Sequence, residues 1–239
     1  MAATIRSMEP FMSSTSVSIA DQVAELQAGM SDRLPPDVAA AFATSLAELT
    51  AAGVPAGVAQ PGTEISDVPL LDAHGAPTSL HSVAADRPVV LVFYRGAWCP
   101  YRNLALKTYR EQLHPALVDR GVTLVAVSPQ KPDGSLSAQE KNDLAFPVLS
   151  DPGNALAGEL GILMPARSDN VRAAQEKLGL QLEDVNADRT DTLPLPTVVL
   201  VDAENRIAWI DVHPDYTTRS EVIDILAAVD SSLQTPSGA

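Results

Sequence analysis

Apolar residues recur at helical spacing in the first quarter of the chain. They return every three or four positions over residues 19–30, and a second such pattern covers residues 36–52. Two helices are therefore predicted, the second preceded by a proline pair and followed by Gly53. Residues 1–15, which carry Ser, Thr and Met without periodicity, are expected to form a loose end.

After the linker AGVAQPGTE, short apolar runs alternate with amphipathic segments. A near-continuous apolar run is typical of a strand that is buried on both faces. Strands are predicted in three such segments, at residues 87–94, 122–128 and 146–151. Two hairpins are also predicted: residues 67–80 turn at His74-Gly75, and residues 197–212 turn at Glu204-Asn205 as an antiparallel pair.

Helices are predicted between and after these strands. One begins at Pro100, since proline is favoured at the first helical position, and Pro115 should kink or interrupt it. Residues 163–191 form a polar insertion. Shorter helices are predicted at residues 138–144, 153–162 and 170–177, the last within this insertion. An amphipathic helix closes the domain, and its predicted apolar face consists of Val222, Ile223, Leu226, Val229 and Leu233.

This order of elements predicts an α/β fold, with a mixed sheet covered by helices. Residues 58–235 are expected to form that domain, and residues 236–239 a short tail. Residues 1–57 hold too little apolar mass to fold alone, so they are interpreted as a tail and a helical extension.

The composition argues against several kinds of partner. Hydrophobic residues make up 46% and charged residues 19% of the 239, as in ordinary globular proteins. Thirty Asp and Glu against sixteen Lys and Arg give a net charge of −14, which disfavours nucleic acid and anionic membrane surfaces. No run approaches the ~20 apolar residues of a membrane span, and the start lacks the apolar core of a secretory signal.

Cys99 is the only cysteine of the chain, so no intrachain disulfide can form and a cytoplasmic location is expected. It follows a predicted buried strand and directly precedes Pro100, which places it at a helix N-terminus. The helix dipole and the guanidiniums of Arg95 and Arg102 favour the thiolate, which is the nucleophilic form. Arg102 lies about one helical turn on and could extend back over the sulfur. The alternative interpretation is a buried cysteine that acts as a small hydrophobe.

The segment FYRGAWCPYRNLAL, residues 93–106, resembles the active-site segment of thioredoxin-fold proteins. More specifically, it resembles the peroxiredoxin-like branch of the alkyl hydroperoxide reductase/thiol-specific antioxidant family, whose usual pattern is FYRG-x-WCPYC. Further segments agree in order, and the resemblance covers about residues 17–233. These segments are PGTEISDVPLLDAHGAPTSL, VTLVAVSPQ, FPVLSDPGNALAGELGI, LPLPTVVLVDAENRIAWIDV and DYTTRSEVIDIL.

The resemblance implies a thioredoxin-like fold and peroxide reduction, with Cys99 as the peroxidatic cysteine. The thiolate would attack a peroxide and become a sulfenic acid, while the arginines and helix amides stabilise the developing charge. Pro196 matches the family's cis-proline, which would face the sulfur, and Arg219 matches a position that is often basic. Tyr94 and Trp98 are expected to wall the site or to join the core.

The chain departs from the family pattern in two ways. Arg102 replaces the second cysteine, so regeneration would require an external thiol, either a low-molecular-weight thiol or a thioredoxin- or glutaredoxin-like protein. Val92 and Gly96 replace the Pro and the Thr or Ser of P-x-x-x-T-x-x-C, so the hydroxyl that usually helps to hold the peroxide is missing. Gly96 is nevertheless predicted to adjoin the bound peroxide.

Three other functions remain open at this stage. A monothiol, glutathione-dependent oxidoreductase would use CPYR, which resembles the glutaredoxin CPYC with its resolving thiol removed, and Arg102 would bind a carboxylate of the tripeptide. A repurposed enzyme would form a covalent adduct at Cys99, and a non-enzymatic redox sensor would alter a partner contact on oxidation.

No metal or cofactor site is predicted. The four histidines are widely separated, without H-x-x-x-H or H-x-H spacing, and no nucleotide-binding glycine motif is present. The extension could pack on the domain or mediate self-association; homodimers are common in the wider family, and the sequence leaves both open.

Overall fold

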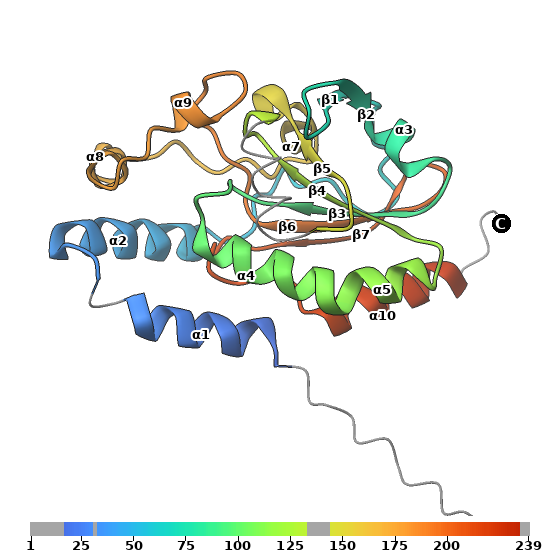
Figure 1. The fold of residues 1–239 in the computed structure, drawn as a ribbon, viewed down its shortest axis with the longest axis horizontal. Coiled ribbons are helices and arrows are strands. Elements are labelled where there is room, and N and C mark those ends of the chain that lie inside the picture. The colour runs from blue at the N-terminus through green and yellow to red at the C-terminus, as the bar shows by residue number, and fades with distance from the viewer. Residues whose placement is uncertain (1–16, 31–32, 133–143, 235–239) are drawn as a thin grey trace, which may run out of the picture.

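The computed structural model describes residues 17–30, 33–132 and 144–234, and it confirms the predicted α/β architecture (Figure 1). The helix predicted at residues 138–144 falls almost wholly outside the described residues, as do the two terminal tails. Within the described ranges, no helix is long and apolar enough to cross a membrane.

A seven-stranded mixed sheet lies at the centre, in the order β2-β1-β5-β4-β3-β6-β7. The strands are β1 (Pro69–Leu71), β2 (Pro77–Ser79), β3 (Val89–Phe93), β4 (Thr123–Ser128), β5 (Val148–Ser150), β6 (Thr197–Val201) and β7 (Ile207–Val212). β3, β4 and β5 are parallel neighbours, while β6 pairs antiparallel with both β3 and β7. Every residue of β3 and β6 is buried, because helices cover both faces, and this explains their uninterrupted apolar runs. The predicted strands and both hairpins are confirmed.

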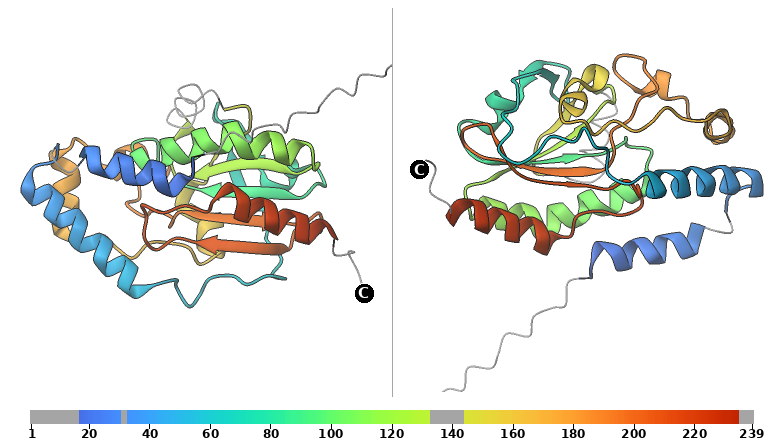
Figure 2. Two further views of the ribbon diagram at one scale, coloured as in Figure 1. Left: turned by 90° about the horizontal axis from the view of Figure 1, so that it is seen from below. Right: turned by 180° about the vertical axis from the view of Figure 1, so that it is seen from behind.

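Helices cover both faces of the sheet (Figure 1). The helices of the described residues are α1 (Ile19–Met30), α2 (Pro36–Ala52), α3 (Leu80–Ala84), α4 (Pro100–Thr108), η1 (Tyr109–Leu113), α5 (His114–Val118), η2 (Pro152–Asn154), α7 (Ala155–Glu159), α8 (Asp169–Lys177), α9 (Leu182–Val185) and α10 (Val222–Gln234). The α4–η1–α5 segment and α10 lie side by side on one face (Figure 2), and α3 and α7 cover the other. The sequence did not predict α3 or α9, because a helix of one turn shows no periodicity.

The helix that begins at Pro100 is interrupted as predicted, and the interruption is a π-helical turn. α4 widens into η1 and the chain returns to α-helix as α5. Pro115 has no N–H, and its ring crowds the carbonyl four residues earlier. The wide turn before Pro115 accommodates this crowding and still buries Tyr109 and Leu113 completely.

The predicted apolar face of α10 was partly wrong. Ile223 is 75% exposed and Leu233 is 49% exposed, whereas Ile225 and Val229 are fully buried. Ile223 is rotated by about 100° from Val222 around the helix, which removes it from the stripe that faces the sheet. Leu233 lies in the last turn of the helix.

The N-terminal extension packs onto the domain through both of its helices. Ile19 and Val23 of α1 belong to the core cluster beside α4. The carboxylate of Glu221 accepts hydrogen bonds from the first backbone amides of α1, Ile19 N at 3.0 Å and Ala20 N at 2.8 Å. α2 runs beside α8, with Val38 fully buried and Asp37 paired to Lys177. The extension is therefore part of the tertiary structure.

The linker after α2 is held against the end of α7 by a close backbone approach at Gly161. Gly161 has φ +69°, and a Cβ there would overlap the carbonyl of Gly57. Next to it, Ala59 N donates to Leu160 O at 3.0 Å. Only glycine satisfies both the positive φ and this contact.

We expect Gly161→Ala to destabilise the fold far more than Gly121→Ala. Gly121 has nearly the same φ, +70°, but nothing lies within 4 Å of the position that a Cβ would take there, so its substitution should cost only about 1 kcal/mol of backbone strain. Gly161→Ala adds a collision with backbone and should lower the free energy of unfolding by roughly 3 kcal/mol or more. Urea unfolding of both variants measures the difference, and equal losses would contradict the proposed contact.

Candidate active site

Cys99 lies where the central strand β3 leads into α4. The chain leaves β3 at Phe93, crosses a short loop and enters α4 at Pro100, with Cys99 as the N-cap residue. Cys99 N donates to Gly96 O at 3.1 Å, which closes this loop. The side chain of Cys99 is fully buried. The predicted position at a helix N-terminus is confirmed.

Two guanidiniums and a backbone amide face the sulfur. Arg95 Nη2 donates to Cys99 Sγ at 3.4 Å, and the positive charge of Arg219 also acts on the sulfur. The backbone N–H of Arg102 approaches the sulfur from the first turn of α4. Burial raises the pKa of Cys99, but the positive charges of Arg95 and Arg219 and these hydrogen bonds outweigh it, so the pKa of the thiol is lowered overall.

Arg95 is held in place by two aromatic rings. Its guanidinium carbon lies 3.9 Å from the centre of the Tyr216 ring and 5.1 Å from that of Trp98. Such stacking fixes a planar cation while its edge still donates to the sulfur. The sequence analysis did not predict Tyr216 as a site residue. Its position three residues before Arg219, which was predicted, could have indicated it.

The loop between β7 and α10 carries Arg219 to the sulfur. Arg219 Nη1 donates to Tyr216 O at 2.8 Å, and Tyr109 Oη in η1 donates to Ser220 O at 2.7 Å. His213 lies 2.7 Å from Thr218 Oγ1 through Nδ1 and 3.0 Å from Asp211 Oδ2 through Nε2. These bonds fasten both ends of the loop, and the site therefore includes Arg219, which the sequence could not place.

The side chain of Arg102 is directed to the protein interior. Its Nε donates to Gly96 O at 3.4 Å, and its guanidinium carbon lies 5.2 Å from the ring centre of Tyr94. Both residues are almost completely buried. Arg102 therefore supports the loop before Cys99 and offers the sulfur its backbone amide, while Tyr94 packs in the core cluster on the α4 side.

Gly96 stands where the family pattern has a hydroxyl residue, and the structure explains this choice. Its φ is +154°, which disfavours L side chains, and a Cβ would overlap the indole nitrogen of Trp98 and lie 2.9 Å from its Cδ1. The side chain of Gln130 accepts a hydrogen bond from Ala97 N on the same loop. The indole of Trp98 therefore occupies the space that a threonine or serine would need.

The prediction of a cis bond before Pro196 was wrong: the bond is trans. The segment before β6 is extended, and it pairs on both sides. Leu195 N donates to Ile162 O at 2.7 Å, and Pro196 O accepts from His213 N at 2.9 Å. A trans bond keeps both pairs in register with β6. Pro196 is buried directly before Thr197, which pairs with Phe93 at the end of β3.

Arg95 lines two cavities. The larger, about 330 Å³, lies between α2 and the segment that leads into α8, and the smaller, about 270 Å³, lies beside Trp98 and Tyr101. Four residues line both cavities: Phe42, Arg95, Gln175 and Tyr216. Phe42 and Gln175 belong to the extension and the insertion, and no local pattern linked them to Cys99.

Comparison with known sequences identifies the family. The profile of the AhpC/TSA family matches residues 61–210, more than half of the chain. The chain belongs to the AhpC/TSA family. This confirms the predicted resemblance and identifies the protein as a thiol peroxidase of the peroxiredoxin type. No curated protein matches the sequence.

Solved structures of peroxiredoxins share the fold. Peroxidoxin BcpB from Mycobacterium tuberculosis is 20% identical, with a TM-score of 0.55 over 72% of this chain and 97% of its own. A Peroxiredoxin 6 mutant from Arenicola marina is 18% identical, with a TM-score of 0.56 over 76% and 80%. The yeast mitochondrial 1-Cys peroxiredoxin is 13% identical, with a TM-score of 0.55 over 74% and 77%. The predicted thioredoxin-like fold is confirmed.

Because the pKa of Cys99 is lower in the folded protein than in the unfolded chain, the folded protein binds fewer protons at this site. The lowered pKa therefore makes its full contribution to the free energy of unfolding above about pH 8.5, where an unfolded cysteine ionises. That contribution is lost as the pH falls toward the lowered pKa of the folded state.

We expect Arg95→Met to raise the pKa of Cys99. The substitution removes the nearest positive charge and one hydrogen bond from the sulfur, so the thiolate should form at higher pH. Thiolate ultraviolet absorbance against pH measures the shift, with a Cys99→Ser protein as the blank. Arg206→Met is a matched control, since Arg206 is exposed and pairs with Glu64. An unchanged titration in Arg95→Met would contradict the assignment.

Proposed function

We propose that the protein is a single-cysteine peroxidase in which the Cys99 thiolate reduces a hydroperoxide. The main support is the buried Cys99 sulfur, which accepts a hydrogen bond from Arg95 and whose pKa is lowered by the charges of Arg95 and Arg219. Two buried donors nearby, Arg95 Nε and Trp98 Nε1, have no hydrogen-bond partner among the described residues. A peroxide offers two oxygen acceptors, and donors that keep no internal partner are suited to bind them.

In the first step, the thiolate attacks the terminal oxygen of ROOH. A new S–O bond forms while the O–O bond breaks, so sulfur is oxidised to sulfenic acid and the peroxide is reduced. The leaving RO⁻ takes a proton and departs as alcohol, or as water when the substrate is hydrogen peroxide. Arg95 carries its charge next to the reacting sulfur and would stabilise the negative charge that develops on the leaving oxygen.

In the second step, an external thiol must regenerate Cys99, because the chain has no second cysteine. A thiol R′SH attacks the sulfenic sulfur, which gives a mixed disulfide and water. A second R′SH attacks this disulfide and releases Cys99 and R′SSR′. Each of these two attacks consumes a reduced thiol, so a reducing compartment such as the cytoplasm suits the proposed cycle.

A single-turnover oxidation tests this function. Reduced protein is mixed rapidly with hydrogen peroxide or an organic hydroperoxide, and Trp98 fluorescence is followed over the background of Trp209. We expect the addition of one oxygen at Cys99 by mass spectrometry, reversed by a small thiol and absent in Cys99→Ser. Arg95→Met should slow the oxidation by about 10²-fold, as when a charge-stabilising donor is removed from other active sites. Oxidation no faster than that of free cysteine would refute the proposal.

A further inference from the structure

The larger cavity beside Arg95 is built from parts of the chain that are far apart in sequence. α2 contributes Phe42, Ser45 and Glu48, and the insertion contributes Arg167 and Gln175. Its volume of about 330 Å³ falls at the low end of the range for small-molecule sites. Arg95, which donates to the sulfur, forms part of its wall. The guanidinium of Arg95 therefore adjoins both this cavity and Cys99.

The elements around the cavity restrict what can reach the sulfur. Cys99 is fully buried, and α2 is tied to the insertion by the ion pair of Asp37 with Lys177. Tyr216 Oη also donates to Phe42 O at 3.4 Å, which links α2 to the loop that carries Arg219. A folded protein thiol would have to displace these contacts, whereas a small thiol can enter the cavity as it stands.

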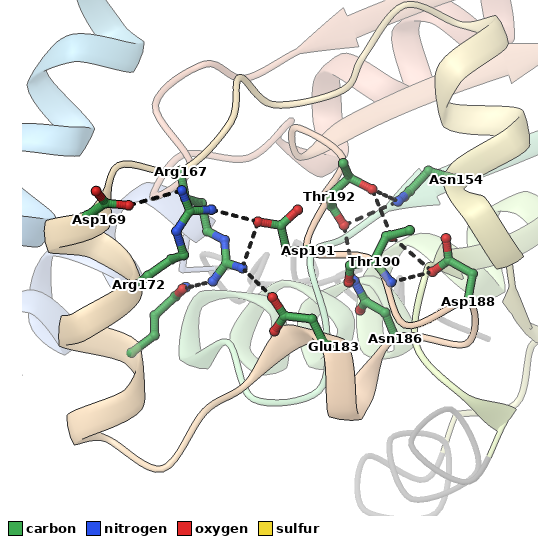
Figure 3. Close-up of polar contacts among 11 residues, drawn as sticks. Asn154, Arg167, Asp169, Arg172, Glu183, Asn186, Asp188, Thr190, Asp191 and Thr192 are labelled. Atoms are coloured by element: carbon green, nitrogen blue, oxygen red, sulfur yellow. Dashed lines mark hydrogen bonds and ion pairs between the residues drawn. The ribbon is translucent and has the colours of Figure 1, made fainter.

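The charged residues that line the cavity indicate the chemistry of its ligand. They are Arg95, Arg167 and Glu48, and of the two cations only Arg95 is bonded to the sulfur. The side chain of Arg167 is 10% exposed, and its Nε is buried without a partner among the described residues. Arg167 Nη2 pairs with Asp191 at 3.2 Å and with Glu183 at 3.7 Å, and Nη1 donates to Gln175 Oε1, so the guanidinium is held in a fixed place at the cavity wall with Nε left for a ligand (Figure 3).

We propose that this cavity binds the reductant, a low-molecular-weight thiol with a carboxylate, and that Arg167 binds that carboxylate. The inference rests on the proposed function, because it assigns a site to the second step of the cycle. Guanidinium and carboxylate form charge-assisted, often bidentate hydrogen bonds. Glu48, on the opposite side in α2, suits an ammonium group on the same ligand, as in an amino-acid-like thiol.

The oxidation of Cys99 itself would open the way from the cavity to the sulfur. Arg95 is attracted to the thiolate, and a protonated sulfenic acid carries no charge. The bound thiolate then attacks the sulfenic sulfur, forms the S–S bond and displaces hydroxide, which takes a proton to become water. A second molecule of the same thiol attacks the mixed disulfide, so that two thiols are oxidised for each peroxide reduced.

Arg172 provides a matched control for Arg167. Both guanidiniums pair with Asp191, Arg172 at 2.9 Å, and Figure 3 shows them converging on its carboxylate. Only Arg167 lines the cavity. Arg167→Gln and Arg172→Gln therefore weaken the same polar network, but only the first removes a cation from the proposed site.

The experiment measures reduction of preformed Cys99 sulfenic acid by mercaptopropionate and mercaptoethanol, with rate constants corrected for thiolate fraction. In the native protein we expect mercaptopropionate to react about tenfold faster, the value of one charge-assisted hydrogen bond. The net charge of −14 would by itself repel this anion, so such a preference requires a local cation. Arg167→Gln should abolish the preference, and Arg172→Gln should retain it.

Several outcomes would overturn the inference. These are equal rates for the two thiols in the native protein, loss of the preference in both variants, or retention of it in Arg167→Gln. Faster reduction by thioredoxin than by mercaptopropionate at equal thiolate concentration would also refute it. If circular dichroism shows that Arg167→Gln does not fold, the comparison of mercaptopropionate with mercaptoethanol on the native protein still tests the inference. Failure of the proposed function is distinct, because no sulfenic acid would then form before any thiol is added.

Discussion

The buried contact between the Cys99 sulfur and the guanidinium of Arg95 is the interaction on which the site depends. A thiolate removed from water is strongly unfavourable unless cations and N–H donors replace its hydration. Arg95 and Arg219 are both more than nine-tenths buried, so each guanidinium in turn requires an anion. The three groups stabilise one another, and none of them would be a favourable interior residue alone.

Contacts extend outward from Cys99 and Arg95 to both added parts of the chain. The Tyr216 ring stacks on Arg95, and its hydroxyl donates to Phe42 O in α2. α2 in turn pairs with α8 of the insertion through Asp37 and Lys177. The extension and the insertion are thus joined to the chemistry through stacked and hydrogen-bonded side chains.

Local patterns in the sequence were sufficient for the strands, the hairpins and the position of Cys99. Apolar runs mark buried strands such as β3 and β6, and Pro100 marks the helix start beside the cysteine. The direction of the Arg102 side chain was not accessible in this way, because its choice between the sulfur and Gly96 O depends on packing against Tyr94. Tyr216, Phe42 and Gln175 meet at Arg95 only through tertiary structure. The trans bond at Pro196 likewise reflects pairing with Ile162 and His213 that no short motif encodes.

The contact between Gly96 and Trp98 has a consequence for how this sequence can change. A hydroxyl residue at position 96 needs the space that the Trp98 indole fills. Substitution of either residue alone therefore gives a collision or a void, while a joint change avoids both. The two positions form an epistatic pair, and an evolutionary path back to the family pattern would have to pass through a smaller residue at position 98 first.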